Sequence, residues 1–205
     1  MESDTYRTIT NPSEEVLFKD RNSKFFGYAF HVSNEEEIRH HLETLKKQHH
    51  SARHWCYAYR LGTTEPEVNY RANDDGEPNN SAGMPIYGQI QSFEVTNILI
   101  VVVRYFGGTK LGVSGLINAY RTTAQMALEA SEVVTKIITK TISITFGYAN
   151  INKVMRIIKE KNLEVANQKL ELACEVIILV RLQEIPSILE FFQAQFGVEA
   201  KILND

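Results

Sequence analysis

The chain has 205 residues, of which 43% are hydrophobic and 23% are charged, and its formal net charge is −3. These values are typical of a globular protein and exclude a strongly basic protein that coats nucleic acid, so any nucleic-acid surface must be a local patch. The polar start of the chain and its longest apolar run, residues 98–103, predict neither a secretory signal nor a membrane span. We therefore expect a cytoplasmic protein in which Cys56 and Cys174 stay reduced and unpaired.

Residues 1–135 are expected to form an N-terminal domain. In chain order the patterns predict a strand over residues 25–32, a helix that starts at a capping box of Ser33 and Glu36, a strand over 55–61, a long polar loop over 63–83, a strand over 98–104 and a helix over about 113–130. The strand over 98–104 is apolar on both faces, which predicts a central strand covered on both sides. Residues 131–136 are the expected joint to the next domain.

Residues 136–205 show the clearest periodicity and are expected to form a C-terminal domain. The predicted strands cover residues 142–146, 163–170, 172–181 and 198–202, with Leu172 on the inner side of its strand. One helix is expected to use Asn150 as its cap, and a second to carry Pro186 in its first turn and Phe196 in its apolar stripe. The order β-α-β-β-α-β predicts a ferredoxin-like domain, so the expected fold class is α+β with two domains.

An acidic loop, residues 73–85, is the first motif that could carry chemistry. Three carboxylates, those of Asp74, Asp75 and Glu77, fall within four residues. Carboxylates at this spacing can hold a hard cation or a cationic partner. Asp, Gly, Asn and Pro are also ordinary turn formers, which makes a solvated turn the alternative. The spacing differs from that of a calcium loop, and we predict no metal site and no cofactor.

A glycine loop, residues 104–115, is the second motif. Arg104 ends the buried strand. The candidate binding residues between it and the first turn of the next helix are Gly107, Gly108, Lys110, Gly112 and Gly115. Glycines let backbone amides approach a ligand, and the helix start adds the positive end of its dipole, so the loop suits a phosphate or another anion. The alternative is that the glycines only allow the helix to pack closely on the sheet. The loop matches neither common nucleotide-binding fingerprint.

His54 and Cys56 share one face of a predicted strand. Residues two apart on a strand lie roughly 7 Å apart, which is too far for a hydrogen-bonded catalytic pair without bending. We therefore assign no catalytic residue and interpret Cys56 as a small buried side chain.

The two loops are expected to meet at one edge of the sheet. The glycine loop leaves the central strand at its C-terminal end, and an antiparallel neighbour puts His54 at the same edge. Because a partly buried carboxylate needs a cation, we expect one of the three acidic-loop carboxylates within ion-pair reach of Arg104 or Lys110. The alternative role for such a bridge is to fasten the loop and nothing more.

Several segments at fixed spacing resemble the signature of the YigZ/IMPACT family. They are Asp-Asp-Gly-Glu-Pro at 74–78, Ser-Ala-Gly at 81–83, Val-Val-Val-Arg-Tyr-Phe-Gly-Gly-x-Lys-Leu-Gly at 101–112, and His-Trp-Cys-Tyr-Ala-Tyr-Arg at 54–60. The resemblance covers about residues 20–131. Two departures stand out, because Asn79-Asn80 replaces a Ser-Gly pair and Asn118 stands where family members commonly carry an arginine. The second departure removes a positive charge beside the glycine loop.

The resemblance implies a fold and a biological setting. The N-terminal domain is similar to an α/β module of ribosomal proteins and elongation factors, and the C-terminal domain to the last domain of a translocating elongation factor. Eukaryotic relatives act in translational control. The leading hypothesis is thus a cytosolic, non-catalytic RNA- or ribosome-associated protein with a role in translation regulation. The alternatives are an enzyme, a hydrolase or transferase acting on an anionic substrate between the two loops, and a protein-interaction module. No membrane partner is expected, and the oligomeric state is left open.

Overall fold

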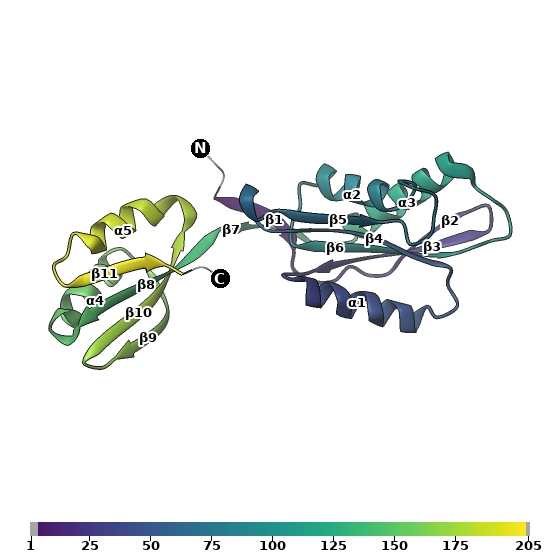
Figure 1. The fold of residues 1–205 in the computed structure, drawn as a ribbon. Helices are drawn as coiled ribbons and strands as arrows, with labels where there is room; N and C mark the ends of the chain where they lie inside the picture. Colours follow the sequence, from purple (N-terminus) through teal and green to yellow (C-terminus); the bar gives the residue numbers. More distant parts are fainter. Residues whose placement is uncertain (1–3, 204–205) are drawn as a thin grey trace. The chain divides into compact units, whose positions relative to one another are not determined.

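The computed structural model describes residues 4–203 of the chain. The chain divides into two compact units, one of residues 6–136 and one of residues 137 onward together with the start of the chain up to Thr5 (Figure 1). That these units are separately folding domains stays a prediction. Among the described helices, none is long and apolar enough to cross a membrane.

A five-stranded sheet forms the middle of the first unit. Its strands are β2 (Val16–Asp20), β3 (Ser23–His31), β4 (His54–Leu61), β5 (Asn69–Asn73) and β6 (Ile98–Tyr105), paired antiparallel in the order β2-β3-β6-β4-β5. Strand β6 is central, and all but its last residue are buried. The expectation drawn from its apolar sequence is therefore confirmed.

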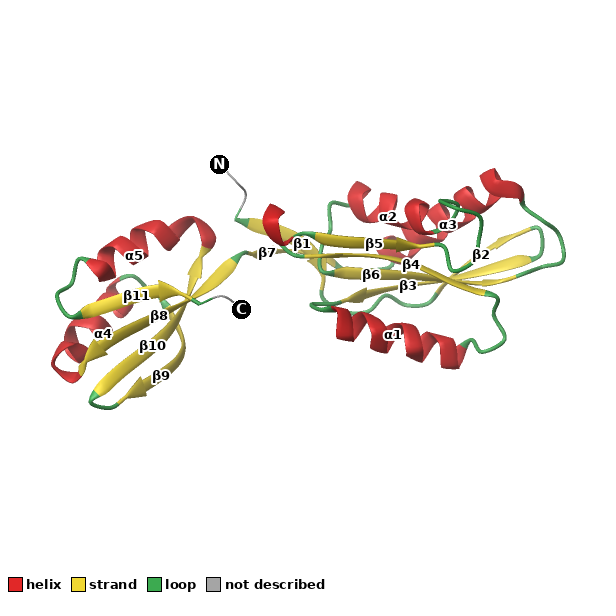
Figure 2. Cartoon of the chain, in the orientation of Figure 1, coloured by secondary structure: helices red, strands yellow, loops and turns green. Residues whose placement is uncertain are grey.

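Helices cover both faces of this sheet (Figure 2). Helix α1 (Glu35–Gln48) lies on one face, and helices α2 (Gly83–Ser92) and α3 (Gly112–Glu129) lie on the other. The side chains of β6 alternate between the two cores: Leu99, Val101 and Val103 pack with α1, whereas Ile98, Ile100 and Val102 pack with α2 and α3. This period of two on a doubly covered strand explains the unbroken apolar run in the sequence. The unit is thus an α/β sandwich.

The capping box of α1 lies one residue later than expected. Asn34, not Ser33, is the cap, and its side-chain oxygen accepts a hydrogen bond from the Glu37 amide at 2.9 Å. Glu37, not Glu36, completes the box by accepting from the Ser33 amide at 2.8 Å. Ser and Asn are both good caps, so the sequence did not decide between the two registers.

The long loop predicted over residues 63–83 contains regular structure. A short 3₁₀ helix (Glu65–Glu67) is followed by β5, the edge strand next to β4. Three of the five β5 residues are exposed, so the strand lacks the apolar alternation that would have revealed it. Helix α2, which begins within the last residues of the acidic-loop segment, was also not predicted.

Two strands that the sequence did not predict pair with each other. Strands β1 (Thr5–Ile9) and β7 (Val133–Ile137) form a two-stranded sheet. Strand β7 covers most of the segment expected to be a simple joint, so that segment is hydrogen-bonded β structure. Its residues are half-buried or exposed, which hid it from a search for apolar runs.

The second unit has the element order expected from the sequence. Its elements are β8 (Thr139–Gly147), α4 (Ile151–Glu160), β9 (Glu164–Leu170), β10 (Ala173–Arg181), α5 (Ile185–Gln193) and β11 (Val198–Ile202), with short 3₁₀ turns before each helix (Tyr148–Asn150 and Leu182–Glu184). The sheet order is β11-β8-β10-β9. Ile144 of β8, Val154 of α4 and Phe192 of α5 belong to one core, so both helices pack on the same sheet.

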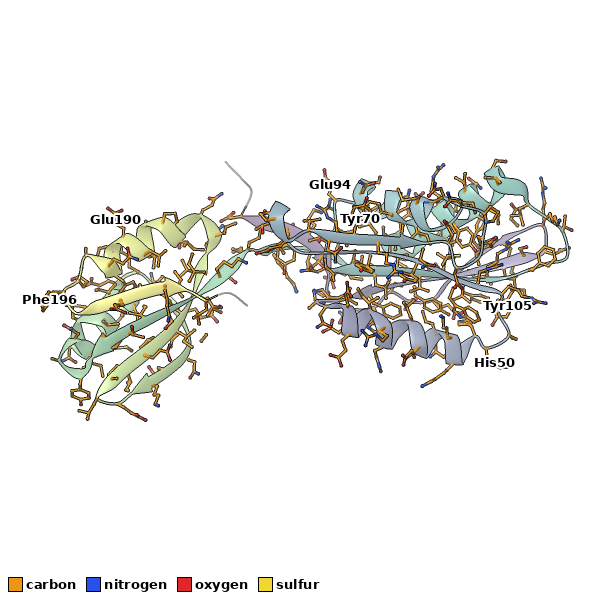
Figure 3. All side chains as sticks on the ribbon, viewed as in Figure 1. His50, Tyr70, Glu94, Tyr105, Glu190 and Phe196 are labelled. Carbon is orange, nitrogen blue, oxygen red and sulfur yellow. The ribbon has the colours of Figure 1, made fainter. Side chains whose placement is uncertain are left out.

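Three side chains of this unit differ from expectation. Leu172 is 91% exposed because β10 begins only at Ala173, and Phe196 is 95% exposed because α5 ends at Gln193. Figure 3 shows Phe196 projecting from the unit. Asn150 makes no side-chain cap; its amide nitrogen lies 3.4 Å from the carbonyl oxygens of Phe196 and Gly197.

We expect the two phenylalanines near the end of α5 to contribute unequally to stability. Phe192→Ala should lower the free energy of unfolding by about 3–5 kcal/mol, because the ring is fully buried. Phe196→Ala should change it by less than about 0.5 kcal/mol. Urea denaturation of both variants measures the difference, and equal losses would contradict the observed end of the helix.

Candidate functional site

The C-terminal end of β6 gathers the ends of three strands. Arg104 pairs across the sheet with Phe25 of β3 on one side and with His54 of β4 on the other. In Figure 3, Tyr105 and His50 mark this end of the unit. His54 therefore lies at the edge from which the glycine loop emerges, as expected.

An ion pair joins the two loops at this edge. A terminal nitrogen of Arg104, Nη1, lies 2.5 Å from Oε1 of Glu77, and the two side chains are only 7% and 4% exposed. The Tyr120 hydroxyl of α3 donates to the same carboxylate oxygen at 2.8 Å. Nε2 of His54 lies 3.9 Å from it. The expected meeting of an acidic-loop carboxylate with Arg104, near His54, is thus present.

The His54 ring is oriented by the acidic loop. Nδ1 lies 2.8 Å from the Asp75 carbonyl oxygen. Because a carbonyl only accepts, Nδ1 carries the hydrogen and Nε2 is the nitrogen turned toward Glu77. The Asp75 carbonyl therefore orients the His54 ring, whereas the 3.9 Å between Nε2 and Glu77 is too long for a hydrogen bond.

Asp74 and Asp75, the other two carboxylates of the acidic loop, bind backbone amides and not cations. Asp74 accepts from the amides of Asn80, Ala82 and Gly83 at 2.8–2.9 Å, which shapes the loop and the start of α2. Asp75 accepts from the Trp55 amide at 2.7 Å. Backbone N–H groups satisfy these carboxylates as well as a cation would, so the two residues hold the loop and are not free for acid–base chemistry.

Cys56 is a buried structural thiol. It donates to the Asp74 carbonyl at 3.0 Å, and its sulfur lies 3.3 Å from the Tyr120 hydroxyl oxygen. Burial raises the pKa of the Cys56 thiol far above its ordinary value, and burial also raises the pKa of Tyr120. A thiol that stays protonated at neutral pH is a poor nucleophile. Cys56 and Cys174 are both free.

The glycines of the glycine loop serve different purposes. A Cβ on Gly107 would lie 2.0 Å from the backbone carbonyl carbon of Asn22, so only glycine fits there. Gly108 and Gly112 have φ of +87° and +77°, and no atom lies within 4 Å of a Cβ built at either. Gly115 lies in the first turn of α3, against Leu111. Close packing thus explains Gly107, whereas the backbone at Gly108 and Gly112 is open.

A pocket of about 360 Å³ joins the two loops. Glu77 and Pro78 line it from the acidic loop, and Arg104, Phe106 and Lys110 line it from the other side, together with apolar residues at the start of α3. Phe106, 48% exposed, has no place in the sequence-based set of site residues. The sequence feature that could have identified Phe106 is its position directly before two glycines at the end of a buried strand.

Lys110 differs from Arg104 in its surroundings. Its side chain is exposed, and within residues 4–203 it makes no ion pair with the acidic loop. The loop's one buried carboxylate is already engaged by Arg104. Lys110 therefore adds its positive charge to the pocket without an internal counter-charge.

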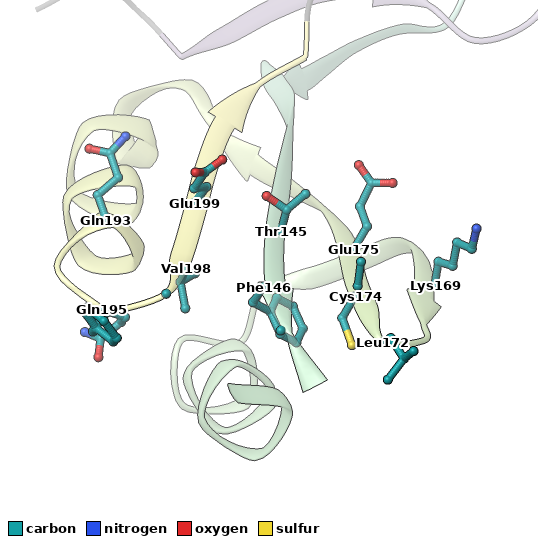
Figure 4. A pocket seen from close by; sticks show the side chains of 14 residues that line it. Thr145, Phe146, Lys169, Leu172, Cys174, Glu175, Gln193, Gln195, Val198 and Glu199 are labelled. Carbon is teal, nitrogen blue, oxygen red and sulfur yellow. The ribbon is translucent and has the colours of Figure 1, made fainter. Parts of the chain in front are cut away.

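A larger pocket of about 890 Å³ lies in the second unit (Figure 4). Phe146, Cys174 and Val198 line it at the ends of β8, β10 and β11, and the exposed Leu172 borders it. The Cys174 thiol donates to the Glu171 carbonyl at 3.0 Å. Two charged side chains of its lining have partners within the unit, because Lys169 lies 3.5 Å from Glu171 and Glu175 accepts from the Ser143 hydroxyl, so the pocket in the first unit is the better candidate site. Across the described part of the chain, no three His, Cys, Asp or Glu side chains lie close enough to hold a metal ion.

Two glycine-to-alanine substitutions test whether a glycine is required by close packing or can be replaced without a steric clash. Gly107→Ala should lower the free energy of unfolding by about 1–3 kcal/mol, because the backbone of Asn22 must move. Gly88→Ala, in α2 with no atom within 4 Å of the added methyl, should be neutral or stabilising by up to about 1 kcal/mol. Thermal or urea unfolding measures both; the same sign for both variants would contradict this account.

A double-mutant cycle measures the Glu77–Arg104 pair. Glu77→Gln or Arg104→Met alone should cost about 3–5 kcal/mol, because each leaves a buried charge uncompensated. The double variant should cost clearly less than the sum of the two.

The exposed pair Arg7–Glu94, with nitrogen and oxygen 3.6 Å apart, is the matched control for this cycle. Its coupling energy should stay below about 1 kcal/mol. A coupling energy for Glu77–Arg104 no larger than that of the control would show that the buried pair does not fasten the loop.

Comparison with known proteins places the chain in a family. The family model described as the Impact N-terminal domain matches residues 21–128. An IMPACT family member of Haemophilus influenzae is 31% identical over 159 residues, which is 77% of each chain. The IMPACT family member YvyE of Bacillus subtilis is 33% identical over 156 residues, 76% of this chain and 70% of that one. A solved structure described as that of a hypothetical protein has a TM-score of 0.75 at 21% identity and covers 100% of both chains, so the fold is shared. The chain belongs to the IMPACT family.

Proposed function

We propose that this protein is a cytosolic, non-catalytic RNA- or ribosome-associated protein that acts in the regulation of translation. Membership of the IMPACT family supports the link to translation, because the resemblance to this family implies a role in translational control, as in its eukaryotic members. Fold and family do not fix a function by themselves, so the proposal also needs support from the site.

The observation that carries the proposal is a group of exposed cations around the end of β6. Its members are Lys19, Arg21, Lys24, Arg53 and Lys110. Lys24 pairs with Tyr105 and with Lys19, and the turn that holds Arg21 lies against Gly107. The Arg53 amide donates to the Arg104 carbonyl. A protein of net charge −3 thus concentrates five cations at one end of one sheet.

The carboxylates near this end offset only part of this positive charge. Arg104 neutralises Glu77, and backbone amides bind Asp74 and Asp75. Asp20, in the same turn as Arg21, offsets one of the exposed cations. With Glu77 paired to Arg104, the five cations face three carboxylates, those of Asp20, Asp74 and Asp75, so positive charge is in excess among these residues, as a local patch for a phosphate backbone requires.

RNA binding at this end should be weak and dependent on salt. Each phosphate contact contributes roughly −0.7 to the slope of log affinity against log salt for a single strand, so five contacts give at most about −3.5. The double substitution Lys24→Gln with Arg53→Gln should reduce the slope by about 1.4. Filter binding of single-stranded RNA and co-sedimentation with ribosomes, at several salt concentrations, measure this.

The control is Lys159→Gln with Lys201→Gln, two exposed lysines of the second unit, which should leave the slope unchanged. Failure of the unaltered protein to bind RNA or ribosomes even at low salt would overturn the proposal. An equal effect of both double variants would assign binding to general charge and not to this end of the sheet.

An enzyme is the second candidate, because one pocket joins the two loops. Glu77 is buried there beside Arg104 and Tyr120, and Nε2 of His54 lies 3.9 Å from its carboxylate. Lys110 would then hold an anionic substrate. This candidate is weaker because Asp74, Asp75 and Cys56 are engaged in structure and the Glu77 charge is offset by Arg104. It becomes the leading function if RNA and ribosome binding both fail.

A further inference from the structure

The pocket that joins the two loops has one planar wall. The ring of Phe106 is 48% exposed and stands at the pocket's edge. The guanidinium carbon of Arg104 lies 5.6 Å from the centroid of this ring and 5.5 Å from that of Phe25. Arg104 is thus held between two aromatic rings and supports Phe106 from within. The exposed part of the Phe106 ring is a fixed surface on which another planar group can stack.

The opposite part of the pocket suits a phosphate. Helix α3 is 18 residues long and begins here, and the residue at its N-cap position, Leu111, provides no side-chain cap. The first amides of a helix lack partners within the helix and sit at the positive end of its dipole. The backbone at Gly112 is open, since no atom lies within 4 Å of a Cβ built there. Lys110 adds a full positive charge beside these amides.

A second observation points to a ligand at the same place. Two large apolar side chains of the lining, those of Phe106 and Val113, are exposed although they border a pocket. Apolar surface of this kind is stabilised when a ligand covers it and removes it from water. Lys110 and the start of α3 therefore offer positive charge and N–H donors beside an exposed apolar wall.

We propose that this pocket binds one unpaired nucleotide of a single-stranded RNA. The base stacks on Phe106, and its phosphate contacts Lys110 and the first amides of α3. The proposal rests on the proposed function, because it assumes that the cations around the end of β6 hold an RNA backbone. At about 360 Å³ the pocket has the size of a small-ligand site, and its apolar wall at Val113 and Leu116 suits a base better than a bare anion. A duplex cannot use it, since its bases are already stacked.

Binding of a short single-stranded RNA labelled with a fluorophore tests the proposal by anisotropy. Phe106→Ala should weaken binding roughly 5- to 150-fold, the range expected for loss of one base stack. Phe106→Tyr, which keeps the ring, should restore most of the affinity. Lys110→Gln should reduce the salt slope by about 0.7. Duplex RNA of equal length should bind without sensitivity to Phe106→Ala.

The matched control is Phe196→Ala, which removes an even more exposed phenylalanine from the second unit and should leave the affinity unchanged. Circular dichroism establishes that each variant is folded. Unaltered binding by Phe106→Ala, in a protein that still binds RNA through the cations at the end of β6, would overturn the nucleotide pocket and leave the proposed function standing. No RNA binding by the unaltered protein would overturn the proposed function itself.

Discussion

The buried contact between Arg104 and Glu77 organises the whole site. Removing both charges from water carries a large desolvation cost, which the short ion pair and the Tyr120 hydroxyl offset. The contact links four parts of the chain, because Arg104 belongs to β6, Glu77 to the acidic loop, Tyr120 to α3 and the adjacent His54 to β4. Since β6 is central and immobilised on both faces, it gives these parts a common fixed point.

Three neighbouring carboxylates of one loop have different roles as a result. Asp74 organises the start of α2, Asp75 holds the start of β4, and Glu77 alone reaches the arginine. Arg104 offsets the charge of Glu77, whereas Asp74 and Asp75 keep their negative charges and are held in place by backbone amides. The pocket beside the loop is lined by Lys110 and the exposed Phe106, so its chemical character differs from that of the acidic motif.

The sequence predicted the features that depend on regular apolar patterns. The burial of β6, the order of elements in the second unit and the meeting of one acidic-loop carboxylate with a cation of the glycine loop follow from strand periodicity and antiparallel pairing. It did not predict β5, because an exposed edge strand needs no apolar face. It also could not show that Asp74 and Asp75 bind amides, because a carboxylate accepts equally from N–H groups and from cations. Phe196 continued an apolar period, but only the observed end of α5 shows that it faces solvent.

The pairing of β6 has a consequence for how the protein reaches its native state. Lys24 pairs with Tyr105, and His54 pairs with Arg104, so both neighbours of the central strand come from residues distant along the chain. The entropy of closing such long loops must be lost before the contacts are gained, which slows the search for the native topology. The end of the sheet at Arg104 and Tyr105 contains the last residue pairs of both ladders. This end can therefore form only after β6 has paired with both β3 and β4, which are the two most distant strand pairings of the sheet. During synthesis, the candidate site cannot form until Arg104 has left the ribosome.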